Sequence, residues 1–173
     1  MNLKSLIPTV PDWPLPGVNF LDITAVLENP RAFAYCISTL GQYCSNWSVT
    51  SLIAVESRGF PFASALAIQL GLPLILARKH GKLPGAVYSQ TYSTEYSQDQ
   101  IEIQQSSLLG SRPVIVDDLL ATGGTILAVA DLVRQNFSVD SVQAVTVINL
   151  SFLPGHQALK DAGIAYQAVE VYE

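Results

Sequence analysis

Short apolar runs alternate with longer alanine- and leucine-rich segments along most of the chain. The runs have the length and the Val, Ile and Leu content of buried strands, and they cover residues 51–56, 72–78, 112–118, 141–150 and 164–172. Helices are predicted over residues 60–70, 124–136 and 154–162, and Gly71 and Gly163 end the first and the last of them. A further helix is expected from Pro30 to about Cys44, because Asn29 can cap it and proline suits the first helical position.

This order of strands and helices predicts an α/β fold, with a mainly parallel twisted sheet flanked by helices. The strands are continuously apolar, as expected when helices cover both faces of the sheet. In such sheets ligands bind beyond the carboxyl ends of the strands. The segments 56–59, 78–85 and 117–125, which follow three of the strands, are therefore the places to look for function.

Composition narrows the class of protein. The 173 residues predict one domain, 1–173, and 49% hydrophobic with 13% charged residues indicates a compact globule. The net charge of −5 disfavours binding to nucleic acid or to a membrane surface, and no apolar run is long enough to span a membrane. The first residues are broken by prolines and lack a signal-peptide core, which predicts a cytoplasmic location.

The cysteines and histidines do not suggest a metal site or a disulfide. Cys36 and Cys44 are the only cysteines, and their spacing fits neither a metal knuckle nor a disulfide framework, so both are expected to be buried in the first long helix. His80 and His156 are isolated, and we expect both at the surface or in loops.

The stretch VIVDDLLATGGT, residues 114–125, carries the clearest chemistry. Asp117 and Asp118 end a buried strand, where ionised carboxylates can accept hydrogen bonds from two neighbouring hydroxyls or hold a water of a hydrated Mg²⁺. Small residues then open a helix, so that backbone N–H groups and threonine hydroxyls can bind a phosphate. This predicted phosphate loop is Ala121, Thr122, Gly123, Gly124 and Thr125. It matches neither the P-loop nor the dinucleotide motif, and it favours a ribose 5′-phosphate.

Positive charge is concentrated in one segment. No Asp or Glu occurs from Ser57 to Thr94, although this span contains four of the nine basic residues. They are Arg58, Arg78, Lys79 and Lys82. Such a segment suits a small polyanion, and a chance run of solvated side chains is the alternative.

The chain resembles the phosphoribosyltransferases that bind phosphoribosyl pyrophosphate (PRPP). VIVDDLLATGGT is similar to their PRPP motif, and four other stretches narrow the resemblance to the adenine phosphoribosyltransferases. They are PGVNFLDIT (16–24), ESRGF (56–60), RKHGKLPG (78–85) and YSTEYS (92–97). The resemblance implies the type I phosphoribosyltransferase fold with a small N-terminal hood and a flexible lid loop. It also implies transfer from PRPP to adenine, which gives AMP and pyrophosphate, with Mg²⁺ held mainly through PRPP and no direct protein ligand, and a homodimer.

The resemblance also implies roles for particular residues. Asp117 and Asp118 would bind the ribose hydroxyls, and the phosphate loop the 5′-phosphate. Arg58 would contact pyrophosphate from a loop that often contains a non-proline cis peptide. The other residues expected to bind pyrophosphate are Arg78, Lys79, Lys82 and Tyr96. Their positive charges would stabilise the departing group.

The resemblance assigns base recognition and proton transfer to two further segments. Residues 11–27 are the expected base-binding segment, in which Phe20 would stack on adenine, flanked by Asn19 and Leu21. Many family members have arginine where Leu21 stands, which leaves the base preference open. Residues 88–100 are the expected lid, and Glu95 within it would exchange a proton with the purine.

Two alternatives stay open. One is a phosphoribosyltransferase for hypoxanthine, guanine or xanthine, because backbone groups near Phe20 can serve a 6-oxo or a 6-amino purine. The other is a non-catalytic regulator that senses PRPP. The negative charge and the presence of Glu95 with Lys79 and Lys82 favour an enzyme over a regulator.

Overall fold

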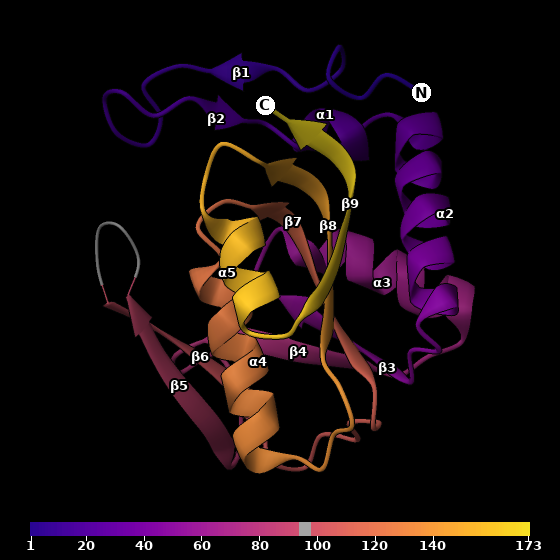
Figure 1. The fold of residues 1–173 in the computed structure, drawn as a ribbon, viewed down its shortest axis with the longest axis vertical. Coiled ribbons are helices and arrows are strands. Elements are labelled where there is room, and N and C mark those ends of the chain that lie inside the picture. Colours follow the sequence, from indigo (N-terminus) through magenta and orange to yellow (C-terminus); the bar gives the residue numbers. More distant parts are fainter. Residues whose placement is uncertain (94–97) are drawn as a thin grey trace.

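A computed structural model describes residues 1–93 and 98–173. Its main sheet has seven strands in the order β5-β6-β4-β3-β7-β8-β9. Five neighbouring strands are parallel: β4 (Leu74–Lys79), β3 (Ser51–Val55), β7 (Pro113–Leu120), β8 (Gln143–Leu150) and β9 (Ala165–Tyr172). The predicted α/β fold with a mainly parallel sheet is therefore confirmed, as Figure 1 shows.

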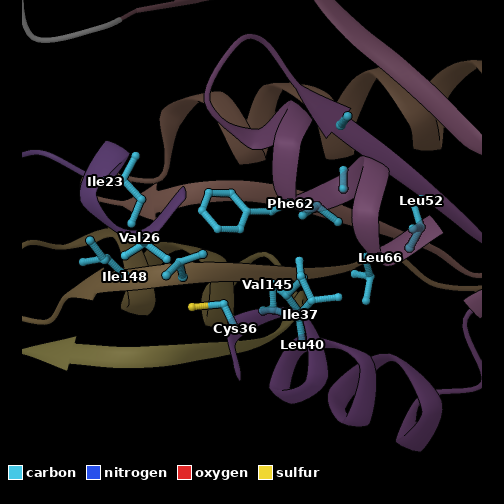
Figure 2. Close-up of a cluster of buried hydrophobic side chains, with 14 of the residues drawn as sticks. Ile23, Val26, Cys36, Ile37, Leu40, Leu52, Phe62, Leu66, Val145 and Ile148 are labelled. Atoms are coloured by element: carbon cyan, nitrogen blue, oxygen red, sulfur yellow. The ribbon is translucent and has the colours of Figure 1, made fainter. Parts of the chain in front are cut away.

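Two helices cover one face of the sheet. They are α2 (Pro30–Asn46) and α3 (Gly59–Leu70), and their buried side chains form one core cluster with β3, β7 and β8. Figure 2 shows Phe62 and Leu66 of α3 and Ile37 and Leu40 of α2 packed around Val145. The side chain of Asn29 caps α2 as predicted, since its oxygen accepts the N–H groups of residues 31 and 32 at 3.1 Å.

Helix α4 (Gly124–Asn136) lies on the other face with the second core cluster. It occupies the residues predicted from the sequence, and α5 (Gly155–Asp161) follows β8 as expected. Gly71 and Gly163 end α3 and α5 with positive φ angles of 65° and 67°. Cys36 and Cys44 are buried free thiols, as predicted, and burial raises the pKa of each to about 12.

An antiparallel hairpin extends the sheet beyond β4. Its strands are β5 (Val87–Ser93) and β6 (Gln98–Gln104), and neither was predicted as a strand. Ile101 and Ile103 alternate with the polar residues Glu102 and Gln104, and this period of two is typical of a strand. The expected lid, 88–100, overlaps this hairpin, and residues 94–97 lie outside the described part of the chain.

The N-terminal segment forms a small hood over the carboxyl ends of the parallel strands. Strands β1 (Thr9–Val10) and β2 (Phe20–Leu21) pair in a separate antiparallel sheet, and the short helix α1 (Thr24–Leu27) follows. Figure 1 places the hood above the ends of β7 and β8. No helix in the described residues is long and apolar enough to cross a membrane.

Candidate functional site

The three segments singled out in the sequence lie together at the carboxyl edge of the sheet. They follow β3, β4 and β7, which are neighbours in register. A cis peptide joins Glu56 and Ser57 after β3, as the resemblance implied. Gly59 then begins α3 so close to β7 that a Cβ atom there would overlap the carbonyl oxygen of Val116. This close approach brings Arg58 to the aspartates.

Arg58 connects the aspartates to the hood. Its Nε atom lies 3.0 Å from Oδ2 of Asp118, and its guanidinium lies 4.8 Å from the centre of the Phe20 ring. Trp13 contacts Phe20 edge to face with ring centres 4.3 Å apart. Together these side chains form one aromatic and cationic group that reaches from the hood to the end of β7.

A pocket of about 360 Å³ lies between the hood and the sheet edge. Its lining residues are Val10, Trp13, Phe20, Asp22, Ile23, Thr24 and Arg58. Of the three predicted base-binding residues, only Phe20 lines the pocket. Asn19 is exposed, and the Leu21 side chain is buried in the core cluster with 7% of its surface exposed. Any contact that residue 21 makes with a base would therefore come from its backbone.

Trp13 and Asp22 line the pocket but were not singled out from the sequence. Asp22 belongs to the stretch PGVNFLDIT, and its Oδ1 accepts the hydroxyl and the amide of Thr24 at 2.6 and 3.0 Å. These hydrogen bonds lower the pKa of Asp22. The signal for Trp13 was only an aromatic residue beside two prolines, which alone does not indicate a site.

Asp117 and Asp118 form a crowded pair at the end of β7. The side chain of Asp117 accepts the amide of Asp118 at 2.9 Å, and Asp118 has only 3% of its surface exposed. Burial raises the pKa of Asp117 well above its ordinary value, and the carboxylate of Asp118 raises it further. Burial also raises the pKa of Asp118, although Arg58 opposes this. A ligand that donates hydroxyl hydrogen bonds would relieve the pair.

The predicted phosphate loop follows these carboxylates. Gly123 has φ of 86° and precedes α4, whose first turn has no side-chain cap and no acidic residue. Behind the loop, the N–H of Gly155 donates to the carbonyl of Ala121 at 3.0 Å, and a Cβ atom on Gly155 would overlap that oxygen. The loop is thus supported from α5, while among the described residues no N-cap side chain accepts the first N–H groups of α4.

The two basic side chains at the end of β4 are held by carboxylates. Arg78 donates through Nε and Nη2 to Glu56 at 3.2 and 3.1 Å, and through Nη1 to the carbonyl of Lys82. The Nζ atom of Lys79 lies 3.0 Å from Asp99. Burial alone would raise the pKa of Glu56, but the hydrogen bonds from Arg78 and the Lys79 amide outweigh it and lower the pKa.

The remaining predicted residues are placed as follows. Lys82 is exposed, and His80 and His156 are exposed as expected. Glu95 and Tyr96 lie outside the described residues, so their predicted roles stay predictions. Within the described part of the chain, no group of three or more His, Cys, Asp or Glu side chains could hold a metal ion.

Comparisons with known proteins show the family of this chain. Residues 22–169 match the family model described as a phosphoribosyl transferase domain. An adenine phosphoribosyltransferase of Idiomarina loihiensis is 44% identical over 95% of this chain and 93% of that protein.

Solved structures are similar over the whole chain. The crystal structure of an adenine phosphoribosyltransferase from Thermoanaerobacter pseudethanolicus has a TM-score of 0.88 and 40% identity, covering 98% of this chain and 97% of the other. The enzyme from Saccharomyces cerevisiae, complexed with adenine, has a TM-score of 0.88 and 32% identity over 97% and 96% of the two chains. The chain therefore belongs to the phosphoribosyl transferase family and, within it, to the adenine phosphoribosyltransferases.

Proposed function

We propose that the protein transfers the phosphoribosyl group of PRPP to adenine and releases AMP and pyrophosphate. The observation that supports this is that Arg58, which lines the aromatic pocket in the hood, pairs with Asp118, one of two buried carboxylates that precede an uncapped helix N-terminus. These three parts suit a flat base, a ribose diol and a 5′-phosphate, in that order along the site.

In this reaction the bond between C1′ and the pyrophosphate oxygen breaks while N9 of adenine bonds to C1′, and the N9 proton leaves. Phe20 and Trp13 would hold the base, and Asp117 and Asp118 the ribose hydroxyls. Arg58, with the basic side chains at the end of β4 and in the turn that follows, would stabilise the charge that develops on pyrophosphate. Glu95 and Tyr96 keep the roles that the resemblance implies: proton exchange for Glu95 and a PRPP contact for Tyr96.

Mg²⁺ belongs to the proposal as a partner of PRPP. Two adjacent carboxylates are suitable acceptors for water molecules of a hydrated Mg²⁺, but they are too few to form a protein cage by themselves. When bound, the ion would neutralise charge on the pyrophosphate group. Asp117 and Asp118 are the residues that would orient its waters.

The test is to offer purines one at a time. The protein is incubated with PRPP and Mg²⁺, adenine, hypoxanthine, guanine or xanthine is added, and pyrophosphate release is measured. Release with adenine alone is expected. Release with a 6-oxopurine instead would favour the alternative transferase, and PRPP binding without release for any base would favour a regulator.

Assembly and location complete the proposal. The expected homodimer is supported by apolar surface beside β4, where Leu76 and Leu108 are 38% and 84% exposed around a groove. Sedimentation velocity at several protein concentrations tests it, since a monomer at every concentration would contradict it. The expected cytoplasmic location is tested by fractionating cells that express the protein.

A further inference from the structure

Glu102 is a buried carboxylate that lies beside the candidate pyrophosphate-binding lysines and has no role in the site described above. Only 4% of its side-chain surface is exposed. Its Oε1 lies 2.6 Å from Nδ1 of His80, and its Oε2 accepts the N–H of Gly81 at 3.0 Å. Burying a carboxylate is unfavourable unless its oxygens are hydrogen-bonded, and these two contacts offset the cost of burying Glu102.

The residues that Glu102 binds are the middle of a tight turn. The N–H of Lys82 donates to the carbonyl of Lys79 at 3.2 Å, which closes the turn around His80 and Gly81. Gly81 has φ of 72°, a conformation that glycine tolerates better than other residues. The turn therefore has one lysine at each end, and Glu102 binds both residues between them.

Glu102 itself is fixed by the core. It lies opposite Arg78 in the antiparallel pairing of β4 with β6, and its neighbours Ile101 and Ile103 are 1% and 0% exposed. Their burial on the other face of β6 prevents the strand from sliding. The carboxylate is therefore a rigid support for a turn that is otherwise exposed.

We propose that Glu102 is a positioning residue for the pyrophosphate group of PRPP. By binding His80 and Gly81 it holds the backbone of Lys79 and Lys82 in one arrangement, so that both ammonium groups can meet the same polyanion. The inference rests on the proposed transferase function. Removing Glu102 would leave the Gly81 N–H without its acceptor, so the test must distinguish a loss of positioning from a loss of stability.

The test separates PRPP binding from turnover. With adenine saturating, E102A is expected to raise KM for PRPP about tenfold while kcat stays within about twofold, and with PRPP saturating KM for adenine should stay within about twofold. E102Q should recover most of the loss, because its amide oxygen can accept the Gly81 N–H and its amino group can donate to His80. Calorimetric titration with pyrophosphate should show the same order of affinities without any turnover.

Two further variants control for folding. H80A removes an exposed side chain, so it should fold normally, and it is expected to raise KM for PRPP about threefold. I103V trims the buried face of the same strand and should lower the melting temperature without changing KM for PRPP.

An unchanged KM for PRPP in H80A would overturn the inference, as would equal rises in both KM values in E102A. A wild-type protein that releases no pyrophosphate with any purine would instead overturn the proposed function.

Discussion

At the scale of single residues, the site holds a conflict between stability and binding. Asp117 is a carboxylate whose neutral form the fold prefers, because burial and Asp118 raise its pKa above the ordinary value of 3.8. The folded protein therefore binds a proton more readily than the unfolded chain does. The contribution of Asp117 to the unfolding free energy is fully present at pH values below 3.8, and it is lost as pH rises through the higher pKa of the folded state.

This sign predicts the behaviour of D117N. The asparagine oxygen can still accept the Asp118 amide, while the charge is removed. We expect D117N to melt about 2–4 °C above the wild type near neutral pH, a gain of about 1 kcal/mol for a chain of this size. The difference should shrink towards zero as the pH approaches about 4. Thermal melts across this pH range, together with a higher KM for PRPP, test the prediction, and a D117N protein less stable than wild type at neutral pH would contradict it.

At the scale of elements, sequence patterns predicted the helices whose start and end depend only on nearby residues. Helix α4 occupies the predicted residues because a run of apolar positions follows a glycine start, and Asn29 with Pro30 sets the beginning of α2. Strand β6 was missed although its alternation of Ile101 and Ile103 with polar residues is visible, because polar neighbours on both sides masked so short an apolar pattern.

The contacts that make the site depend on pairs distant in sequence. Arg58 meets Asp118 across sixty residues of chain, and Phe20 meets Arg58 only because the hood folds over the sheet. The sequence indicated each residue type but not these pairings. For the same reason it could not indicate that Arg78 is held by Glu56, or that the side chain of Leu21 points into the core.

Glu56, which follows β3 and accepts hydrogen bonds from Arg78 and the Lys79 amide of β4, gives a second prediction about pH. Because its hydrogen bonds lower the pKa of Glu56 below 4.5, the stability it contributes is present above that value and is lost as pH falls through the folded pKa. E56Q should therefore lose about 2 kcal/mol of unfolding free energy near neutral pH. The loss should disappear in acid, as measured by urea unfolding at both pH values.

E170Q is the matched control for the pair of Glu56 and Arg78. Glu170 pairs with Lys4 at 3.9 Å, and the lysine side chain is 47% exposed. Such a pair contributes little because solvent screens it, so E170Q should change the unfolding free energy by about 0.5 kcal/mol or less. Equal losses of unfolding free energy in E56Q and E170Q would show that the pair of Glu56 and Arg78 stabilises the fold no more than an exposed ion pair does.

At the scale of the whole molecule, the hood and the sheet meet through Arg58. Its guanidinium covers the ring of Phe20 and pairs with Asp118, so it contacts the predicted places of both base and ribose. PRPP would compete for Asp118 through its hydroxyls and would attract Arg58 to its pyrophosphate. Adenine alone would have to displace the guanidinium from the aromatic ring, which costs about 0.5–2 kcal/mol. This geometry predicts that PRPP binds before adenine.

The prediction can be measured with Trp13, which contacts Phe20 in the pocket. In a W47F background Trp13 is the only tryptophan, and its fluorescence reports adenine binding in the absence of PRPP. R58A should bind adenine about three- to tenfold more tightly than its parent, although it loses activity, because the competing contact is removed. R78A removes an arginine that does not line the pocket and should leave adenine affinity unchanged. If R58A binds adenine no better than its parent, Arg58 does not control access to the base site and the order of binding must have another cause.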